Sequence, residues 1–418
     1  MNTASPSTSS ISPPWPSNIS VALMTHPRRQ DLVKEFCATH SDIPIEIVVD
    51  PLPDAASSDG AALRTSLLAW DRARSNSNAT HHMVLQDDII LHDDFIPAVT
   101  AMTGAMPQSA LSLFSEWRSP TSTAVRIAAL SGQSWATVLN WYIPTEALIL
   151  PTHVASNFRS YVAKHIDALE TPDDVAILQY LHDIGCEPLV AAPNIVQQLE
   201  VESLVGNIYP AARLSGCYST LPLDRLSWRN GVCYPVLAPH YSRRHSAAMC
   251  MTRERSQPHD YQLVEATRVL EELLGLPHDI EEIQKFSLEL IQPTCDKYKW
   301  RIVFEELVHV VRQVRTIVFL TGYATRHNSD TIEMEPRLEL DQVRVSPFLP
   351  ISIYTTGMSA LLHHYVKQIA GEIWNAISDD LQSMFELGFH MATEPTTNLT
   401  SRAVDTASRA ARTRRAGR

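Results

Sequence analysis

The first half of the chain alternates short apolar runs with stretches of helical spacing. Residues 18–29 and 43–51 each contain an apolar run that ends in a polar turn, which is typical of a buried strand. Between them, residues 29–40 place their apolar side chains on one face of a helix. Strand, helix and strand in this order predict the beginning of an α/β layer.

A second helix is predicted over residues 61–74, where apolar residues recur at every third or fourth position and Asp59 is a candidate N-cap. A polar turn leads from this helix into residues 81–95, an apolar strand that Asp87 and Asp88 interrupt. This interruption is the most informative feature of the sequence. Further along, we predict strands over residues 110–117, 136–150 and 187–196 and helices over residues 156–169 and 171–185.

The pattern changes near residue 250, beyond which helical spacing dominates. We predict helices over residues 261–276, 279–291 and 296–320, a polar interruption or β-hairpin over 328–347, and a long helix or helix pair over 353–391. Trp300 is expected on the apolar stripe of the third helix. The chain should therefore contain an α/β domain over residues 19–250 and a helical domain over 251–395, flanked by a disordered leader (1–18) and a disordered basic tail (396–418).

Length and composition agree with two folded domains. A chain of 418 residues exceeds the size at which a single core stops growing, and 44% apolar against 19% charged residues is a globular balance. The formal net charge of −12 argues against a nucleic-acid partner, because neutralising phosphates requires a basic face. Six arginines between residues 402 and 418 are typical of a solvated chain end.

The sequence favours a cytoplasmic protein with reduced thiols. The first eighteen residues lack the basic start and apolar run of a signal peptide, and no stretch of eighteen apolar residues predicts a membrane span. Six cysteines are scattered without close pairing, unlike the cysteines of a small disulfide-bonded domain.

Asp87 and Asp88 are candidates for a metal and diphosphate site. They stand where an apolar strand should emerge from the sheet, and open α/β sheets bind ligands outside the carboxyl ends of their strands. Two adjacent acids can equally end a strand and solvate a turn. Here Ile89, Ile90 and Leu91 follow at once, so the acids lie between core segments, where carboxylates without a cation or another partner are unfavourable.

Residues 60–88, GAALRTSLLAWDRARSNSNATHHMVLQDD, resemble the segment of GT-A glycosyltransferases in which a glycine and a helix arginine lead to a strand that ends in the metal-binding DxD motif. The likeness is to family-2-like enzymes and to family-25-like lipooligosaccharide transferases, and it extends more weakly from Val21 to about His240. It implies a Rossmann-like mixed α/β sheet of the nucleotide-diphospho-sugar transferase type, Mn²⁺ or Mg²⁺ as cofactor and a UDP- or GDP-sugar as donor.

Carried over position by position, the resemblance makes Asp88 the usual metal ligand of the motif and Asp87 its middle position. Gln86 stands first, where the family usually has an acid. An amide oxygen is a neutral ligand, so metal binding is expected to be weaker here, or Gln86 binds the ribose of the nucleotide instead.

The resemblance also places four residues near the nucleotide. Asp50 matches the strand-end acid that contacts the base or ribose, and Arg64 matches the helix arginine. Thr25 and His26 fall in the loop that follows the first strand. Three of them also have a purely structural explanation: Asp50 as a turn residue before Pro51, Arg64 as a surface residue and His26 as a loop histidine.

Asp173 and Asp174 are candidate catalytic acids. Thr171, Pro172 and Asp174 form a helix-capping arrangement, which explains the local sequence by itself. In inverting GT-A enzymes, however, the general base is often a carboxylate at the start of a helix that faces the acceptor. The resemblance matches Asp174, or else Asp173, to this position, where it would take the proton of the acceptor hydroxyl. The sequence does not decide between inversion and retention.

His240 is matched by the resemblance to a late histidine that adds a ligand to the metal. Together with Cys233, His245 and Cys250 it also includes the residue types of a zinc site, but without the close cysteine pair that makes such a site specific. Trp141 and its aromatic neighbours at positions 135 and 142 are either core residues or a platform for an acceptor, because aromatic faces stack on sugars and other rings.

The sequence thus predicts a metal-dependent glycosyltransferase that moves a sugar from a nucleotide-sugar donor to an unidentified acceptor. Two other classes stay open: a metal-dependent nucleotidyltransferase, and a non-catalytic GT-A-like binding or assembly protein, which the neutral Gln86 favours. A P-loop phosphotransferase is disfavoured, because the sequence lacks a GxxxxGK[ST] loop. The helical domain is a candidate acceptor site or homo-oligomer interface.

Overall fold

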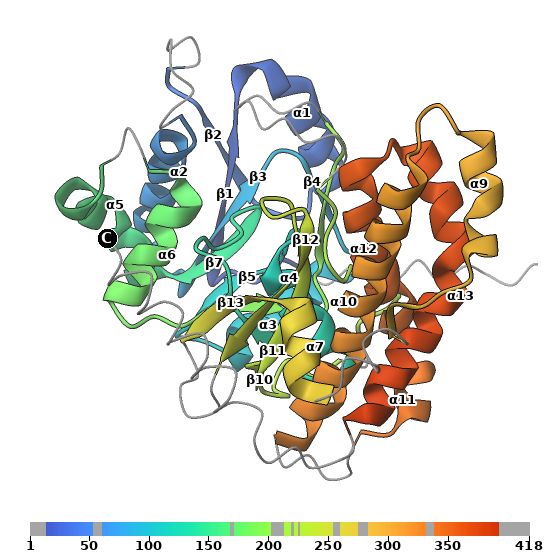
Figure 1. The fold of residues 1–418 in the computed structure, drawn as a ribbon. Coiled ribbons are helices and arrows are strands. Elements are labelled where there is room, and N and C mark those ends of the chain that lie inside the picture. The colour runs from blue at the N-terminus through green and yellow to red at the C-terminus, as the bar shows by residue number, and fades with distance from the viewer. Residues whose placement is uncertain are drawn as a thin grey trace, which may run out of the picture.

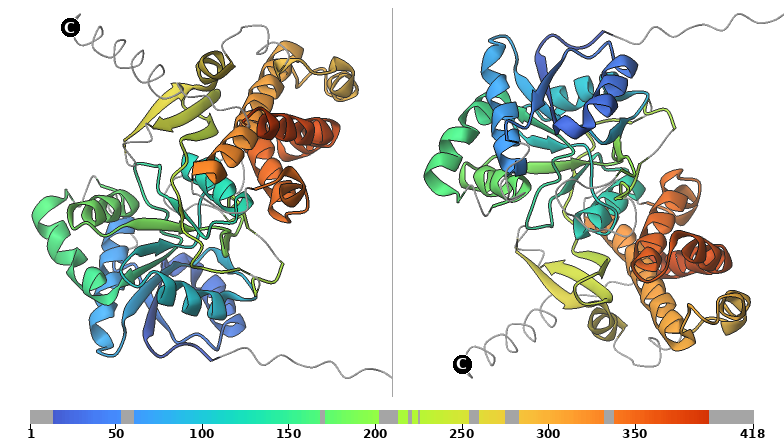
Figure 2. Two further views of the ribbon diagram at one scale, coloured as in Figure 1. Left: turned by 90° about the horizontal axis from the view of Figure 1, so that it is seen from below. Right: turned by 90° about the horizontal axis from the view of Figure 1, so that it is seen from above.

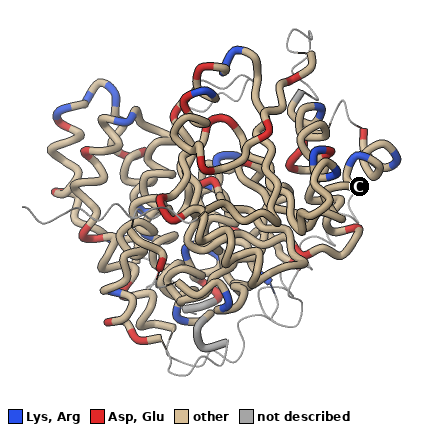
Figure 3. Tube along the Cα trace, turned by 180° about the vertical axis from the view of Figure 1, so that it is seen from behind, with Lys and Arg blue, Asp and Glu red and all other residues tan. Residues whose placement is uncertain are grey.

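The computed structural model describes residues 14–52, 61–167, 171–201, 213–218, 221–224, 226–253, 260–274, 283–331 and 338–392 (Figure 1). An α/β part and a group of C-terminal helices lie side by side, and Figure 2 shows these helices gathered along one side of the α/β layers. Among the described helices, none combines the length and the apolar character that a membrane crossing requires. Acidic and basic residues are interspersed along the described chain (Figure 3).

An eight-stranded mixed sheet forms the centre of the α/β part and confirms the predicted α/β class. Its strands are β1 (Ile19–Thr25), β2 (Ile45–Val49), β3 (His81–Gln86), β5 (Ala110–Ser112), β6 (Trp135–Thr137), β7 (Ala147–Pro151), β8 (Pro188–Ala191) and β10 (Val232–Cys233). They lie in the order β10-β6-β8-β5-β7-β3-β1-β2. Strands β2, β1 and β3 are parallel, whereas β7 runs antiparallel to its neighbours β3 and β5.

Helices cover both faces of this sheet. They are α1 (Gln30–Thr39), α2 (Ala61–Asp71), α3 (Phe95–Ala105), α4 (Pro120–Leu130), α5 (Thr152–His165) and α6 (Asp173–Asp183). On β1, Val21 and Leu23 share a core with α1 and α3, whereas Ala22 shares a core with α2, α5 and α6. The predicted helices are thus confirmed, although α5 begins before residue 156. Helix α3 was not predicted, because its sequence is apolar on almost every side and shows no amphipathic pattern.

Helix α4 joins the two parts of the molecule. Ser119 caps it by accepting a hydrogen bond from the backbone N–H of Ser122 at 3.1 Å. Every residue of α4 after Pro120 is buried, including the charged Arg126. No amphipathic pattern therefore marked this helix in the sequence. Its apolar side chains share one core with the C-terminal helices.

A small antiparallel sheet that the sequence did not predict packs against α4 and the C-terminal helices. It contains β11 (Leu237–Ser242), β12 (Ala247–Arg253) and β13 (Tyr261–Glu265). The prediction of one helix over residues 261–276 was wrong at its start, because β13 pairs with β12 and helix α7 (Ala266–Leu274) begins only afterwards. The domain boundary expected between residues 250 and 251 falls inside β12.

The C-terminal helices confirm the predicted helix pair near the end of the chain. They are α9 (Gln292–Lys297), α10 (Phe304–Thr331), α11 (Leu340–Arg344), α12 (Phe348–His364) and α13 (Lys367–Met391). The placement of Trp300 on a helical stripe was wrong, since it lies in the turn between α9 and α10 with 70% of its surface exposed. The expected hairpin was also wrong for the described residues, because α10 and α11 occupy its two ends.

Helices α10 and α13 approach each other closely at two glycines. A Cβ atom on Gly322 would lie 2.0 Å from the carbonyl oxygen of Phe385, and one on Gly388 would lie 2.0 Å from the carbonyl oxygen of Phe319. Real Cβ atoms do not come this close to backbone, so the crossing requires glycine at both positions.

The predicted leader and tail lie outside the described residues, except for residues 14–18. There Trp15 stacks near Phe95 with 6.4 Å between ring centroids, and its Nε1 donates to the carbonyl oxygen of Ile19 at 2.8 Å. This end of the predicted leader is therefore part of the fold. The candidate cap Asp59 lies outside the described residues. All six cysteines are free, as predicted.

Candidate functional site

The carboxyl ends of β1, β2 and β3 meet at one edge of the large sheet. The chain passes from β1 to β2 on one side and later to β3 on the other side of β1. This arrangement is a topological switch point, where open α/β sheets bind ligands. The register aligns the ends of the three strands, so Thr25, Asp50, Asp87 and Asp88 emerge at the same edge.

Asp87 and Asp88 are buried and held by two neighbours. The two residues are 5% and 7% exposed. Thr25, which is the last residue of β1 and not a residue of the following loop, donates from Oγ1 to Asp87 Oδ2 at 2.6 Å. Arg29 Nη1 lies 2.6 Å from Asp87 Oδ1 and 3.1 Å from Asp88 Oδ2. One guanidinium group therefore bridges both carboxylates.

Arg29 belongs to the site although it was not predicted. It ends the 3-10 turn η1 (Pro27–Arg29) and is the N-cap residue of α1, which places its side chain beside the end of β3. Burial opposes its charge, but hydrogen bonding and attraction from Asp87 and Asp88 outweigh burial and raise the pKa of Arg29. The sequence feature that could have identified Arg29 is the pair of basic residues in the loop after the first strand.

Gln198 reaches the acid pair from β9 (Val196–Gln198), which pairs with β4 (Ile89–Leu91) immediately after the acids. Gln198 Nε2 donates to Asp88 Oδ2 at 3.2 Å. Asp88 Oδ1 and Gln198 Oε1 are both buried, and neither has a hydrogen-bond partner in the described part of the chain. Two side chains in contact thus each present an acceptor oxygen that lacks a donor, which is unusual for buried polar atoms.

These two oxygens fit a divalent cation. Mg²⁺ takes oxygen ligands and is often held by only one or two carboxylates, with water and substrate phosphates completing its shell. Asp88 Oδ1 and Gln198 Oε1 can provide such ligands, with Asp87 beside them. Among the residues that the structure describes, no three His, Cys, Asp or Glu side chains form a metal-holding group. A cation at this edge would therefore depend on the phosphates of a bound substrate.

Glu146 is a further residue that the sequence analysis missed. It stands immediately before β7, and its backbone carbonyl accepts from the backbone N–H of Gln86 at 2.9 Å, so antiparallel pairing brings it beside the end of β3. Burial raises the pKa of its carboxyl group to about 7. Arg213, whose Nη1 lies 4.0 Å from Glu146 Oε1, lowers this pKa, whereas the charges of Asp88 and Asp174 raise it. The sequence feature that could have identified Glu146 is an acid directly before an apolar strand.

Asp173 and Asp174 begin α6 beside Glu146. Burial raises the pKa of both carboxyl groups, and the charge of Glu146 adds to the shift of Asp173, whereas the charge of Asp173 adds to that of Asp174. Asp173 Oδ2 is buried without a hydrogen-bond partner among the described residues. The structure thus gathers the two predicted acid pairs around Glu146.

The capping arrangement predicted for α6 was wrong. Pro172 is the N-cap residue, and no side chain caps the helix, so Thr171 does not act as the cap. Asp174 Oδ1 accepts a hydrogen bond from the backbone N–H of Val175 at 2.8 Å. The structural explanation for the acidic start of α6 is therefore weaker than the sequence suggested.

Thr145 links the end of β3 to the start of α6. Gln86 Nε2 donates to Thr145 Oγ1 at 3.1 Å, and the Thr145 hydroxyl stabilises the charged form of Asp173 by hydrogen bonding. The Gln86 side chain thus helps to hold the frame of the site together.

Asp50 and Arg64, both predicted near the nucleotide, bind each other at the end of β2. Arg64 Nη2 donates to the two oxygens of Asp50 at 2.9 and 3.0 Å, and its Nε donates to Asp50 Oδ1 at 3.1 Å. His26 Nδ1 accepts from the backbone N–H of Arg28 at 3.2 Å and caps η1. Arg64 is therefore not a simple surface residue, and His26 has a structural role.

The structure does not bring His240 to the acid pair. His240 lies in β11 of the small sheet, where its Nδ1 is 3.4 Å from the carbonyl oxygen of Ala238. Burial lowers its pKa to about 4, so the ring is neutral. Within the described chain no group of metal-ligating side chains includes it or the suggested zinc set. We therefore leave His240 out of the site proposed below.

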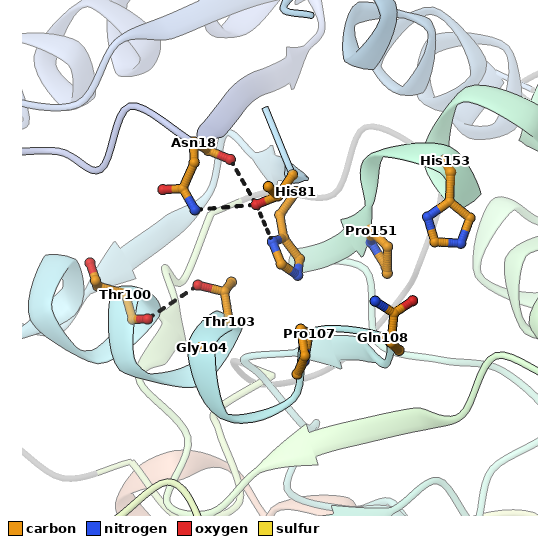
Figure 4. Close-up of a pocket in the computed structure, with 10 residues that line it drawn as sticks. Asn18, His81, Thr100, Thr103, Gly104, Pro107, Gln108, Pro151 and His153 are labelled. Atoms are coloured by element: carbon orange, nitrogen blue, oxygen red, sulfur yellow. Dashed lines mark hydrogen bonds between the residues drawn. The ribbon is translucent and has the colours of Figure 1, made fainter. Parts of the chain in front are cut away.

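A cavity of about 350 Å³ lies at the opposite edge of the sheet (Figure 4). Its wall includes Asn18, which precedes β1, and His81, which begins β3, together with Pro107 and His153. Because Asn18 and His81 stand at the amino ends of the parallel strands β1 and β3, the cavity is separate from the acidic site.

The chain was compared with known proteins. No family model matches it, and no curated protein matches its sequence. The function proposed next therefore rests on the geometry of this site.

Proposed function

We propose that the chain is a metal-dependent glycosyltransferase of the GT-A type, which transfers a sugar from a UDP- or GDP-sugar to an acceptor hydroxyl. The observation that carries this proposal is the buried Asp87–Asp88 pair at the switch point of the sheet, beside the unpartnered acceptor oxygens of Asp88 and Gln198. Parallel strands that end at this edge support a nucleotide site there.

The edge around Asp88 suits the donor. A nucleoside diphosphate leaves with growing negative charge on its phosphates, and the Arg29 guanidinium beside Asp87 can bind those oxygens. A bound Mn²⁺ or Mg²⁺ would supply further neutralisation of the diphosphate. The ion pair between Asp50 and Arg64 at the end of β2 provides fixed polar groups for the ribose or base.

The start of α6 suits the acceptor. In an inverting transfer, the acceptor oxygen bonds to the anomeric carbon, the bond between this carbon and the diphosphate oxygen breaks, and the acceptor proton passes to a carboxylate. Asp174 is our choice for this base, with Asp173 second. Burial raises the pKa of Asp174 to about 7, which is close to the value that favours a general base at neutral pH.

Nucleotide binding tests this proposal directly. We expect UDP or GDP with Mn²⁺ to stabilise the protein by about 2.7 kcal/mol at a ligand concentration one hundred times Kd. Asp88→Asn should remove the effect of Mn²⁺. Incubation with the matching nucleotide sugar should release the nucleoside diphosphate, whereas a nucleotidyltransferase would release pyrophosphate from a nucleoside triphosphate and a sugar phosphate. A panel of nucleotides and nucleotide sugars that leaves melting unchanged with and without Mn²⁺ would favour a non-catalytic binding protein.

A further inference from the structure

An aromatic pair, of which Trp141 is exposed and Tyr142 half-buried, lies on the loop that leads into the acidic site. Trp141 is 72% exposed, and its ring meets that of Tyr142 edge-on, with centroids 5.6 Å apart and an interplanar angle of 83°. Trp135, the third aromatic of this region, is fully buried and donates its Nε1 to the carbonyl oxygen of Trp228 at 3.0 Å. Trp135 is therefore a core residue, whereas Trp141 presents a free ring surface.

The backbone on both sides of Trp141 is fixed. Thr121 Oγ1 accepts from the backbone N–H groups of Leu139 and Asn140 at 2.9 and 3.1 Å. On the other side, the backbone N–H of Ile143 donates to the carbonyl oxygen of Asp174 at 3.2 Å. Trp141 therefore stands on a loop whose backbone is anchored to α4 and to the start of α6.

Trp141 also lies close along the chain to a residue that contacts the start of α6. It is two residues from Ile143, whose backbone binds Asp174, and two residues of chain span at most about 7 Å. The same loop continues into Thr145 and Glu146, which contact the end of β3 and α6. The exposed ring and the candidate general base are thus parts of one short structural unit.

We infer that Trp141 and Tyr142 form the acceptor subsite, and that the acceptor is a sugar. The inference rests on the glycosyltransferase proposed above. A sugar ring combines an apolar face, which stacks on an aromatic ring, with hydroxyl groups that donate hydrogen bonds. Asp174, which is only half-buried at the start of α6, can accept a hydrogen bond from such a hydroxyl. A sugar stacked on Trp141 would lie on the loop whose backbone binds the start of α6.

Steady-state kinetics with Trp141→Ala and Trp141→Phe test the subsite. Loss of one stacked ring is expected to raise the KM for a saccharide acceptor about tenfold. Trp141→Phe should recover most of the loss. The matched control is Trp300→Ala, which removes a ring of similar exposure, 70%, from the turn before α10. An unchanged acceptor KM in Trp141→Ala, or an equal change in Trp300→Ala, would overturn the inference.

Binding of saccharides without turnover separates this inference from the proposed function. Fluorine NMR of protein labelled with 5-fluorotryptophan reports on each tryptophan, and the Trp141→Phe variant assigns the signal of Trp141. This signal should shift on titration with a panel of mono- and disaccharides, while the signal of Trp300 stays in place. Absence of donor turnover together with this shift would contradict the transferase and keep the sugar subsite. Donor turnover together with an unmoved Trp141 resonance, with and without UDP or GDP, would overturn the subsite alone.

Discussion

Replacing Arg29 with Met tests whether the acid pair is held by one guanidinium group. Methionine keeps an unbranched, largely apolar side chain, so it preserves much of the packing while it removes the charge. Asp87 and Asp88 would then lie 5% and 7% exposed next to each other, without the cation that bridges them. We expect a lower free energy of unfolding and a new dependence on divalent ions.

The contact distances give the size of the effect. At an effective dielectric constant of about 20, charges 2.6 and 3.1 Å apart attract by about 6 and 5 kcal/mol, most of which offsets the desolvation of the three charged groups. Removing one partner of a buried ion pair typically costs about 3–5 kcal/mol. Because the Arg29 side chain is still 16% exposed, solvent screens part of the attraction. We therefore expect the free energy of unfolding to fall by about 3 kcal/mol.

Chemical unfolding at pH 7.5, with and without Mn²⁺, measures the prediction. In Arg29→Met, Mn²⁺ at one hundred times its Kd should restore about 2.7 kcal/mol, because the ion replaces the missing counter-charge. Lys34→Met is the matched control, since it breaks an exposed contact of 2.8 Å with Asp31 and should change stability by less than about 0.5 kcal/mol. A loss below 1 kcal/mol in Arg29→Met, or the same response to Mn²⁺ in both variants, would refute the electrostatic reasoning.

Three further predictions follow from the same structure. Burial raises the pKa of Glu146 to about 7 in the folded protein, against 4.5 for the free group, so the folded state binds more protons between these pH values. The free energy of unfolding should therefore fall as pH rises from 5 to 7.5, by up to about 1.4 kcal/mol per pH unit for this group. Glu146→Gln should flatten this pH dependence in urea unfolding, and a free energy that rises with pH in the unsubstituted protein would contradict the assignment. Gly388→Ala would put a Cβ atom 2.0 Å from a backbone carbonyl oxygen of α10 and should destabilise the protein by about 3 kcal/mol. Gly371→Ala on the same helix places its Cβ atom where nothing lies within 4 Å and should stabilise the protein by about 0.5–1 kcal/mol. Equal melting temperatures in the two variants would show that the helix crossing can relax. Asp174→Asn should reduce sugar transfer at least one hundredfold and Asp173→Asn less, with binding of the nucleoside diphosphate retained, and full activity in both correctly folded variants would remove the acid pair from the mechanism.

The sequence pattern was sufficient to predict strand β1 and helix α1. Strand β1 is a short apolar run that is buried on both faces of the sheet, and helix α1 repeats its apolar residues with the helical period. Helix α4 was missed because neighbouring elements bury every residue after Pro120. Helix α3 was missed because its exposed residues are Pro, Thr, Ala and Gly, so no charged face marks it. The apolar residues of β13 and α7 follow one continuous helical spacing in the sequence. Only pairing with β12 makes the five residues of β13 a strand.

The acid pair could be found from the sequence, because two carboxylates between apolar residues can be recognised within one short segment. Its partners could not, since they come from distant parts of the chain. Arg29 arrives from the start of α1 and Gln198 from β9, while Glu146 precedes the antiparallel strand β7. No local pattern relates these positions.

The sequence by itself thus determined the first strands and helices, and it identified Asp87, Asp88, Asp173 and Asp174 as the residues to examine. The tertiary structure decided which charges meet. It set Arg29 between the first two acids, buried Glu146 beside the other two and left Trp141 exposed on the adjoining loop. The physical reason is that local periodicity reports only whether a side chain faces the core, whereas charge pairing and desolvation depend on strand order and register, which the whole chain fixes together.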